Sequence, residues 1–346
     1  MTLDVEEGRV RLLFGQMNNM STKEVQELKV QALKHIEKKY GTQIGVFNEI
    51  GANFDNARRG VNFQNWMGDH GKSKCVMTYN KNDKEVKCFH QPGGTGIRVT
   101  GAMTQYCRKT TKDPRNLGRY CSAVFYANKR QKFRVISMYN ICKGRPQGLR
   151  TQYQQIMREI QRNGIIGMEP RDLFIYDFVR QCKKWVKNGD GILMMGDVND
   201  CAIKGELTLL LQEEAGLVEF THPFWSGKPP ASHINGEDFL VLGMMSENVE
   251  VTQWLLLPWI SSVGDHRTWI VEVTLRSMLG PNLMKAQKSI ARQLVTTSYK
   301  ALKTNNAIVK KKYEEHNIVS RLRKLLSLIH ISEPTRPERI SYAVFC

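Results

Sequence analysis

Residues 192–200 read ILMMGDVND, and this stretch decides the fold. Consecutive apolar residues ending in glycine predict a buried strand. The strand delivers Asp197 and Asn199 to the edge of a sheet, where a carboxylate and an amide can meet residues from other strands. An aspartate in such a turn also commonly bonds its own backbone, so Asp197 taken alone predicts no chemistry.

The same arrangement occurs near the N-terminus. Residues 44–47 read IGVF and are followed by Asn48 and Glu49, and an apolar strand at 10–14 precedes them. Between these strands the sequence predicts a helix that Ser21 caps and Gly41 ends. The apolar positions at helical spacing are Val25, Leu28, Ala32, Ile36 and Tyr40. Together these elements predict a β-α-β unit.

The rest of the chain is rich in short strands. Runs between 74 and 141 (KCVMTY, EVKCF, TGIRVTG, RYCSAVFYA and FRVISMYNI) are joined by polar turns and predict consecutive antiparallel strands. Helices are expected around 153–160 and 174–185, and strands at 239–242 and 269–273. The expected fold class is α/β (α+β): two mixed β-sheets packed face to face and flanked by helices.

The charge balance indicates a polyanionic partner. The chain has 51 Lys and Arg against 33 Asp and Glu, a net charge of +18, which favours nucleic acid over a membrane surface. No apolar run approaches the roughly 20 residues of a membrane helix, and the first residues lack the features of a secretory signal, so an intracellular protein without membrane contact is expected. The cysteines form no C-x-x-C pair, which argues against a zinc site or a disulfide framework.

Polar residues lie repeatedly next to the predicted strands. Glu49 and Asp197 follow apolar strands, Asp238 precedes the strand at 239–242, and Asp265 and His266 precede the last strand. Each residue taken singly has an ordinary explanation as a turn or solvated residue. Strand ends on one rim can nevertheless gather distant residues into one pocket, so the ordered set is far more specific than any member.

This ordered set resembles the endonuclease/exonuclease/phosphatase superfamily. The matching motifs are QMNN (16–19), FNE (47–49), GGTGI (93–97), GR (118–119), Tyr139 at a strand end, GDVN (196–199), EDF (237–239) and GDH (264–266). The resemblance covers roughly residues 8–275. It implies a four-layered α/β sandwich, as in deoxyribonuclease I, with a single active site at one edge.

The resemblance implies metal-assisted hydrolysis of a phosphodiester. Its metal would be Mg²⁺, with Mn²⁺ as an alternative, and the implied ligands are Glu49, Asp265 and Asn18; such oxygen donors suit a hard cation. The implied catalytic residues are Asp197 (activates the attacking water), Asn199 (holds the water or the phosphate), His266 (donates to a phosphoryl oxygen), Asp238 (pairs with His266 and keeps its imidazole oriented and charged) and Tyr139 (lies near the scissile phosphate). The implied phosphate contacts are Gln16, Asn18 and Arg119.

Some positions depart from the family pattern. Gln16 replaces the usual Asn, and a second register would give that role to Asn18 instead. Asn19 replaces a Gly. Cys142 stands where an Asn is usual, with Asn140 as the alternative, and Gly264 replaces a Ser. These departures leave catalytic competence as an expectation to be tested.

The resemblance narrows to the endonuclease domain of non-long-terminal-repeat retrotransposons, through residues 151–200. Residues 276–325 hold 12 Lys and Arg against two Glu and resemble the basic helical connector that precedes reverse transcriptase in such polyproteins. The implied function is nicking of target DNA in the nucleus for target-primed reverse transcription, with contact between the connector and element RNA. The connector reads equally well as a solvated helix. The alternatives are a cellular abasic-site endonuclease or other phosphodiesterase of this fold, and an inactive nucleic-acid-binding relative.

The last residues do not look native. Residues 326–336 (LSLIHISEPTR) and 340–346 (ISYAVFC) resemble the translation of a sequencing adapter, with 337–339 as its variable index. The expected organisation is therefore an endonuclease domain at 1–275, a basic connector at 276–325 and a non-native tail at 326–346. We expect the natural protein to continue beyond Leu325.

Overall fold

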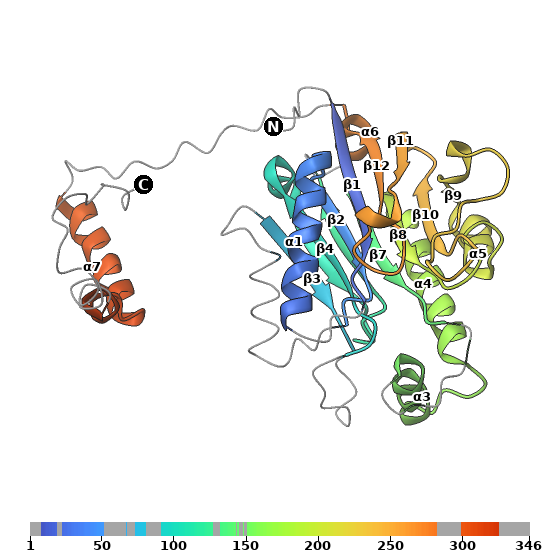
Figure 1. Ribbon diagram of the computed structural model, residues 1–346, viewed down its shortest axis with the longest axis horizontal. Coiled ribbons are helices and arrows are strands. Elements are labelled where there is room, and N and C mark those ends of the chain that lie inside the picture. The colour runs from blue at the N-terminus through green and yellow to red at the C-terminus, as the bar shows by residue number, and fades with distance from the viewer. Residues whose placement is uncertain are drawn as a thin grey trace. The chain divides into compact units, whose positions relative to one another are not determined.

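The computed structural model describes residues 8–18, 23–51, 67, 73–80, 91–126, 132–142, 144, 148, 151–281 and 299–324 (Figure 1). It divides into two units, Met1–Ala286 and Gln287–Cys346. Within the described ranges, no helix is both long enough and apolar enough to cross a membrane.

The first unit contains two six-stranded sheets. One has the order β11-β12-β1-β2-β4-β3, with β1 at Arg9–Gln16, β2 at Ile44–Asn48, β3 at Ser73–Thr78, β4 at Thr95–Thr100, β11 at Val251–Leu256 and β12 at Trp269–Thr274. The other has the order β5-β6-β7-β8-β10-β9, with β5 at Cys107–Lys112, β6 at Tyr120–Phe125, β7 at Lys132–Tyr139, β8 at Asp190–Asp197, β9 at Leu217–Glu219 and β10 at Val241–Ser246. The helices are α1 (Lys23–Tyr40), α3 (Gln152–Arg162), α4 (Pro170–Lys187), α5 (Glu206–Ala215) and α6 (Leu275–Leu279), and short 3₁₀ turns lie at Gly101–Gln105, His222–Phe224 and Trp259–Ser261.

The period of two along each strand produces four layers. In β8, Leu193 and Met195 face the core between the sheets, whereas Ile192 and Met194 pack against α4 and α5. In β1, Phe14 faces the inter-sheet core, whereas neighbouring Leu13 packs under α1. Each face of these strands packs against another layer, which explains why apolar residues lie on both faces. The predicted sandwich is confirmed.

The predicted β-α-β unit is also confirmed, because β1 and β2 are parallel neighbours joined through α1. The predicted buried face of the helix was partly wrong. Leu28 is 66% exposed, while Val30, Leu33 and the charged Glu37 are buried. Glu37 forms a buried ion pair with Arg98 of β4, so the buried face of the helix contains a charged residue as well as apolar ones. Ser21, the predicted cap, lies outside the described residues.

The antiparallel run predicted for 74–141 is divided between the sheets. β3 pairs with β4 in the first sheet, whereas β5, β6 and β7 pair in the second. The predicted strand at 85–89 lies outside the described residues. The strand predicted at 239–242 begins instead at Val241. Sequence analysis did not predict β5, β9, β11, α5 or α6.

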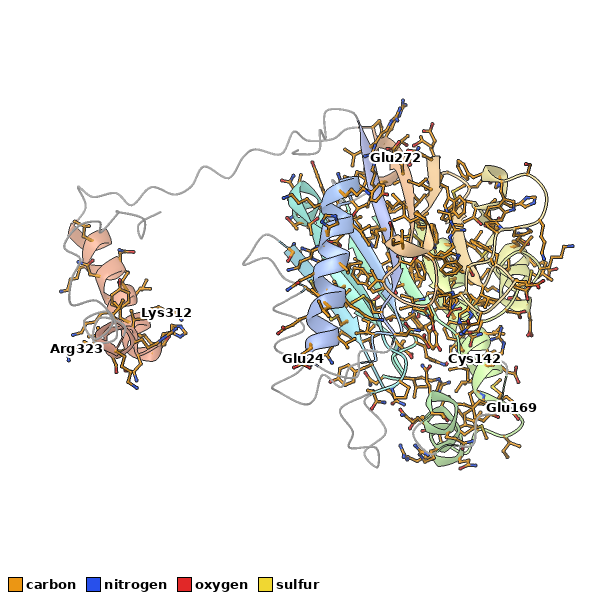
Figure 2. All side chains as sticks on the ribbon, in the orientation of Figure 1. Glu24, Cys142, Glu169, Glu272, Lys312 and Arg323 are labelled. Atoms are coloured by element: carbon orange, nitrogen blue, oxygen red, sulfur yellow. The ribbon has the colours of Figure 1, made fainter. Side chains whose placement is uncertain are left out.

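The described part of the second unit is α7 (Tyr299–Glu315) followed by helical residues up to 324. Its basic side chains, including Lys312 and Arg323, are exposed (Figure 2). Lys312 also pairs with Glu315 one turn away, at 2.9 Å. The proposed adapter tail lies outside the described residues.

Candidate active site

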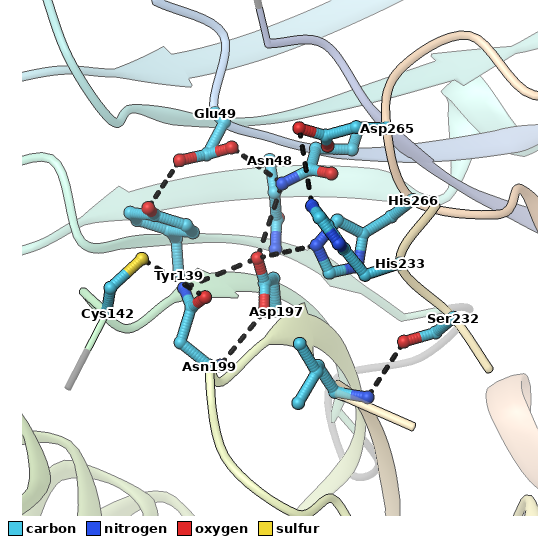
Figure 3. Close-up of polar contacts among 12 residues, drawn as sticks. Asn48, Glu49, Tyr139, Cys142, Asp197, Asn199, Ser232, His233, Asp265 and His266 are labelled. Atoms are coloured by element: carbon cyan, nitrogen blue, oxygen red, sulfur yellow. Dashed lines mark hydrogen bonds and ion pairs between the residues drawn. The ribbon is translucent and has the colours of Figure 1, made fainter. Parts of the chain in front are cut away.

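The ends of four strands meet at one edge of the two sheets. β1 and β2 are parallel and end in the register pair Gln16 and Asn48, and β7 and β8 are parallel and end in the pair Tyr139 and Asp197. Parallel strands bring their carboxyl ends to the same side. Figure 3 shows side chains from both sheets pointing toward one another at this edge, as the sequence analysis predicts for Glu49, Asp197 and His266.

Asn48, which has no predicted role, joins the two sheets directly beneath this edge. Its Nδ2 donates to the carbonyl of Met138 at 2.5 Å, and Ser137 Oγ donates to Asn48 Oδ1 at 2.9 Å. Both Asn48 and Ser137 are 0% exposed. A buried amide satisfied in this way fixes β2 against β7. It thereby fixes the distance between Glu49, which follows β2, and Tyr139, which ends β7.

Gln16 bridges the two principal carboxylates. Its Nε2 donates to Glu49 Oε2 at 2.6 Å and to Asp197 Oδ2 at 3.3 Å. Gln16, the first residue of the QMNN motif, is therefore the residue that bridges the two carboxylates. Asn18 also turns its Oδ1 inward, and neither Gln16 Oε1 nor Asn18 Oδ1 has a hydrogen-bond partner among the described residues. Asn19, the third departure in this motif, lies outside the described residues.

Glu49 has an unusual backbone conformation and lies among other charged groups. Its backbone has φ 47°, a left-handed conformation that the other described non-glycine residues adopt only at asparagines. Such strain outside glycine tends to occur at functional sites. Burial raises the pKa of Glu49 to about 7, the Asp265 carboxylate adds to this rise, and hydrogen bonds from Tyr139 and Gln16 oppose it. The Tyr139 hydroxyl donates directly to Glu49 Oε1.

Asp197 is 1% exposed at the end of β8. Its Oδ1 accepts from the backbone N–H of Asn199 at 2.9 Å, so the ordinary Asx-type turn is present, while Oδ2 faces Gln16 and His266. Burial, followed by the neighbouring Glu49 carboxylate, raises the pKa of Asp197 well above its ordinary value. One carboxylate oxygen therefore holds the turn and the other faces the site.

Asn199 is held by the strand end next to it. Its Nδ2 donates to the carbonyl of Asn140 at 2.7 Å, and Cys142 Sγ donates to its Oδ1 at 3.3 Å. Cys142 thus contacts the site residue directly. The side chain of Asn140 is buried, and its amide atoms have no partner within the described ranges.

His266 is paired differently from the prediction. Its Nε2 lies 3.5 Å from Asp197 Oδ2, whereas the predicted partner Asp238 has an exposed side chain. Phe239 is buried against Trp225, whereas Asp238 lies in a bend before β10 with its side chain exposed. Burial lowers the pKa of His266 to about 4, which makes it a neutral imidazole. The predicted Asp238–His266 pair is therefore absent from this structure, in which His266 faces Asp197. The lowered pKa favours the neutral imidazole over the predicted charged one.

His233 belongs to the site although sequence analysis did not find it. Its Nε2 lies 3.7 Å from Asp265 Oδ2, and its ring centroid is 4.9 Å from that of His266. A backbone bridge pairs His233 with His266. A histidine in a loop of the sequence SHING carries no periodic or motif signal, so only the tertiary structure reveals it.

Arg119, predicted to contact phosphate, has a structural position. Its Nε and Nη2 donate to Asp113 at 2.7 and 2.9 Å, and Nη2 also donates to Asp177 at 2.8 Å. The side chain is 1% exposed, inside this ion-pair network between β6 and α4. The carboxylates bind Nε and Nη2, Nη1 is buried without a hydrogen-bond partner among the described residues, and the phosphate contact of Arg119 stays a prediction.

The packing around Gly264 explains why a glycine stands where the family usually has a serine. A Cβ at this position would lie 2.6 Å from the carbonyl oxygen of Gln16 and 2.9 Å from Asn18 Oδ1. The loop before β12 therefore packs directly on the end of β1. A serine at 264 has no room in this arrangement.

The residues at the edge fit a hard divalent cation. Glu49 and Asp265 supply carboxylates, and the buried oxygens Asn18 Oδ1 and Asp265 Oδ1 are unpartnered within the described part of the chain. Burial raises the pKa values of Glu49 and Asp197, and neighbouring carboxylates add to both: Asp265 acts on Glu49, and Glu49 acts on Asp197. A cation would relieve this repulsion. Oxygen donors of this kind are those that Mg²⁺ prefers.

No family model and no curated protein matches the sequence. Solved structures do match in fold. The AP endonuclease LMAP from Leishmania major has 11% identity and a TM-score of 0.58, over 78% of this chain and 88% of that one. The human Nocturnin catalytic domain has 9% identity and a TM-score of 0.52, over 77% and 94%. An endonuclease/exonuclease/phosphatase from Bacteroides vulgatus has 9% identity and a TM-score of 0.50, over 77% and 98%. This chain therefore has the fold of the endonuclease/exonuclease/phosphatase proteins.

Proposed function

We propose that this chain is a divalent-metal-dependent endonuclease that hydrolyses phosphodiester bonds of DNA. The observation that carries the proposal is the bridge from Gln16 Nε2 to both Glu49 and Asp197 at the meeting edge of the two sheets. Two buried carboxylates sharing one neutral donor are costly for stability unless they serve a cation or a reaction.

Glu49, Asp265 and Asn18 would hold Mg²⁺, with Mn²⁺ as a substitute. The ion would supply polarisation of the phosphoryl group and stabilisation of the leaving oxygen. Tyr139 contributes by donating its hydroxyl to Glu49, which fixes the orientation of that carboxylate.

Asp197 is the general base of this proposal. Its Oδ2 faces the site, and its raised pKa makes it a stronger proton acceptor than an ordinary aspartate. Asn199, held by the Asn140 carbonyl, orients the attacking water or the phosphate. The neutral imidazole of His266, 3.5 Å from Asp197, donates to a phosphoryl oxygen or exchanges the proton with Asp197.

DNA is the proposed substrate because the chain carries a charge of +18, and phosphate contacts dominate such binding. We also propose that the domain at 1–275 serves a non-long-terminal-repeat retrotransposon in the nucleus, with 276–325 as a connector to reverse transcriptase and a contact for element RNA. The exposed lysines at 310–312 on α7 support a polyanion contact.

The test is nicking of supercoiled plasmid with Mg²⁺ or with EDTA. We expect open-circular product with Mg²⁺ only, and none from Asp197→Asn. DNA binding without cleavage at any Mg²⁺ concentration would contradict an enzyme and identify an inactive binding relative.

The biological class needs a second experiment. A duplex carrying one abasic site is compared with the intact duplex, because the Leishmania protein of similar fold is an AP endonuclease. Cleavage confined to the abasic site would favour the cellular alternative over the retrotransposon proposal. A reverse-transcriptase reading frame beyond Leu325 in the transcript would support the retrotransposon proposal.

A further inference from the structure

The loop before β12 and the loop before β10 bring two imidazoles and a carboxylate together. His233, Asp265 and His266 each offer one ligand atom, and these atoms lie within 4.8 Å of one another. Two of them, His233 Nε2 and Asp265 Oδ2, are 3.7 Å apart. A tetrahedral ion with bonds of about 2.0–2.1 Å needs donors roughly 3.3 Å apart, so small side-chain rotations close the set.

The backbone already holds these residues in place. Ile234 N donates to the Asp265 carbonyl at 2.9 Å, and Arg267 N donates to the Ser232 carbonyl at 2.8 Å. These two hydrogen bonds flank the bridge between His233 and His266. A ligand set on paired backbone segments loses little conformational freedom on binding.

Unsatisfied atoms supply a second, independent indication of a ligand. Asp265 Oδ1 and His266 Nδ1 are buried and have no hydrogen-bond partner in the described part of the chain. The His266 side chain is 3% exposed. Buried polar atoms without partners are costly, and ion or water coordination is a common explanation for them.

The donor chemistry distinguishes this set from the oxygen set around Glu49. Two imidazole nitrogens and one carboxylate oxygen suit borderline cations such as Zn²⁺, whereas Mg²⁺ prefers oxygen. The spacing of the cysteines does not indicate this site, because the ligands of the site are two imidazoles and a carboxylate. His233 is the residue that makes the set possible.

We propose that His233, Asp265 and His266 form a Zn²⁺ site that inhibits the nuclease. Inhibition rests on the proposed function: Zn²⁺ takes the lone pair of His266 and an oxygen of Asp265, which removes one residue from proton transfer and another from the Mg²⁺ set. Zn²⁺ binding itself does not depend on that function.

The first test measures Zn²⁺ binding by the metal-free full chain, by competition with a chromophoric chelator. The variant His233→Asn removes one ligand, and His35→Asn, on the exposed face of α1, is the matched control. We expect one Zn²⁺ per chain for wild type and His35→Asn, and an affinity at least ~10-fold weaker for His233→Asn. Circular dichroism establishes that all three are folded.

Equal affinity in His233→Asn and wild type, or no stoichiometric binding by wild type, overturns the proposal. Co²⁺ as a spectroscopic probe identifies the donors: visible bands without a thiolate charge-transfer band are expected. A strong thiolate band would show that cysteine holds the ion and would also overturn the site.

The second test measures Mg²⁺-supported nicking against Zn²⁺ concentration, relative to the rate of each protein without Zn²⁺. We expect the inhibition midpoint of His233→Asn to lie at least ~10-fold higher than that of wild type and His35→Asn. An unshifted midpoint rejects inhibition through this site. If wild type does not nick at all, the proposed function fails, while the binding measurement still decides the Zn²⁺ site.

Discussion

His266 Nε2 lies 3.5 Å from Asp197 Oδ2, and the two side chains are 3% and 1% exposed. The contact joins the loop before β12 to the end of β8, so it links one sheet to the other. Burial shifts both groups away from their charged forms, because it raises the pKa of Asp197 and lowers that of His266.

Asp197→Asn keeps the shape of the side chain and removes its proton-accepting charge. We expect Mg²⁺-dependent nicking to fall by roughly 10²–10⁴-fold, because that is the usual loss when a proton-transfer group is removed. DNA affinity should stay broadly unchanged. Rates come from plasmid relaxation, and affinity comes from fluorescence anisotropy in EDTA.

Asp238→Asn is the matched control for that variant, since Asp238 is exposed and His266 faces Asp197 instead. Its rate should stay within a few-fold of wild type. A loss as large as that of Asp197→Asn would show that Asp238 pairs with His266 during turnover, as the family resemblance implies.

Tyr139→Phe removes the hydroxyl that donates to Glu49. We expect the Mg²⁺ concentration for half-maximal nicking to rise by about 10–100-fold, as is typical when a partner of a metal ligand is lost. A Mg²⁺ titration of the nicking rate checks this. A lower rate at every Mg²⁺ concentration with the same midpoint would place Tyr139 on the substrate side instead.

Glu49 makes the stability of the metal-free protein depend on pH. Its pKa is 4.5 in a model peptide and about 7 when folded, mainly because of burial. The folded state therefore binds the proton more tightly, and the free energy of unfolding falls as pH rises from about 4.5 to 7. Urea unfolding in EDTA at several pH values should show a shallower fall for Glu49→Gln. Equal slopes would contradict the raised pKa.

Gly264→Ser places a Cβ 2.6 Å from the Gln16 carbonyl oxygen. We expect about 1–3 kcal/mol lower unfolding free energy, the usual cost of overpacking, together with slower nicking, because the end of β1 must move. Gly144→Ser is the control, since an added Cβ there meets nothing within 4 Å. Thermal unfolding of both variants checks the comparison, and an equally stable Gly264→Ser protein would show that the loop yields.

Arg119→Met leaves the buried Asp113 without its cation, whereas the half-buried Asp177 keeps its ion pair with Arg115. The unfolding free energy should fall by about 3–5 kcal/mol, the usual cost of breaking a buried ion pair. The KM for DNA of the folded fraction should be unchanged. A raised KM without loss of stability would support the phosphate-binding role that the family resemblance implies for Arg119.

Much of the fold could be predicted because its signals are local. The apolar run at 192–195, the strands at 10–14 and 44–47 and the helix between them form where expected, since strand and helix periods are properties of neighbouring residues. The division of β3–β4 and β5–β7 between two sheets could not be predicted, because antiparallel neighbours look alike in sequence whichever sheet they join.

The candidate site also combines features that the sequence predicts with features that it does not. The ordered set of Glu49, Asp197 and His266 places carboxylates and an imidazole at strand ends, and the structure brings them to one edge. The pairing of His266 with Asp197 and the contribution of His233 depend on loops that approach across the two sheets, whereas the network around Arg119 joins the β5–β6 connection to α4.

The sequence by itself predicted many of the strands and the polar residues at their ends, and its charge favours a polyanionic partner. The tertiary structure alone decided which of those residues touch. The physical reason is that side-chain partners are set by register between strands far apart in the chain and by the side on which each loop residue points. Asp238 is an example: it keeps its place in the motif beside the buried Phe239, but the bend before β10 leaves its side chain exposed.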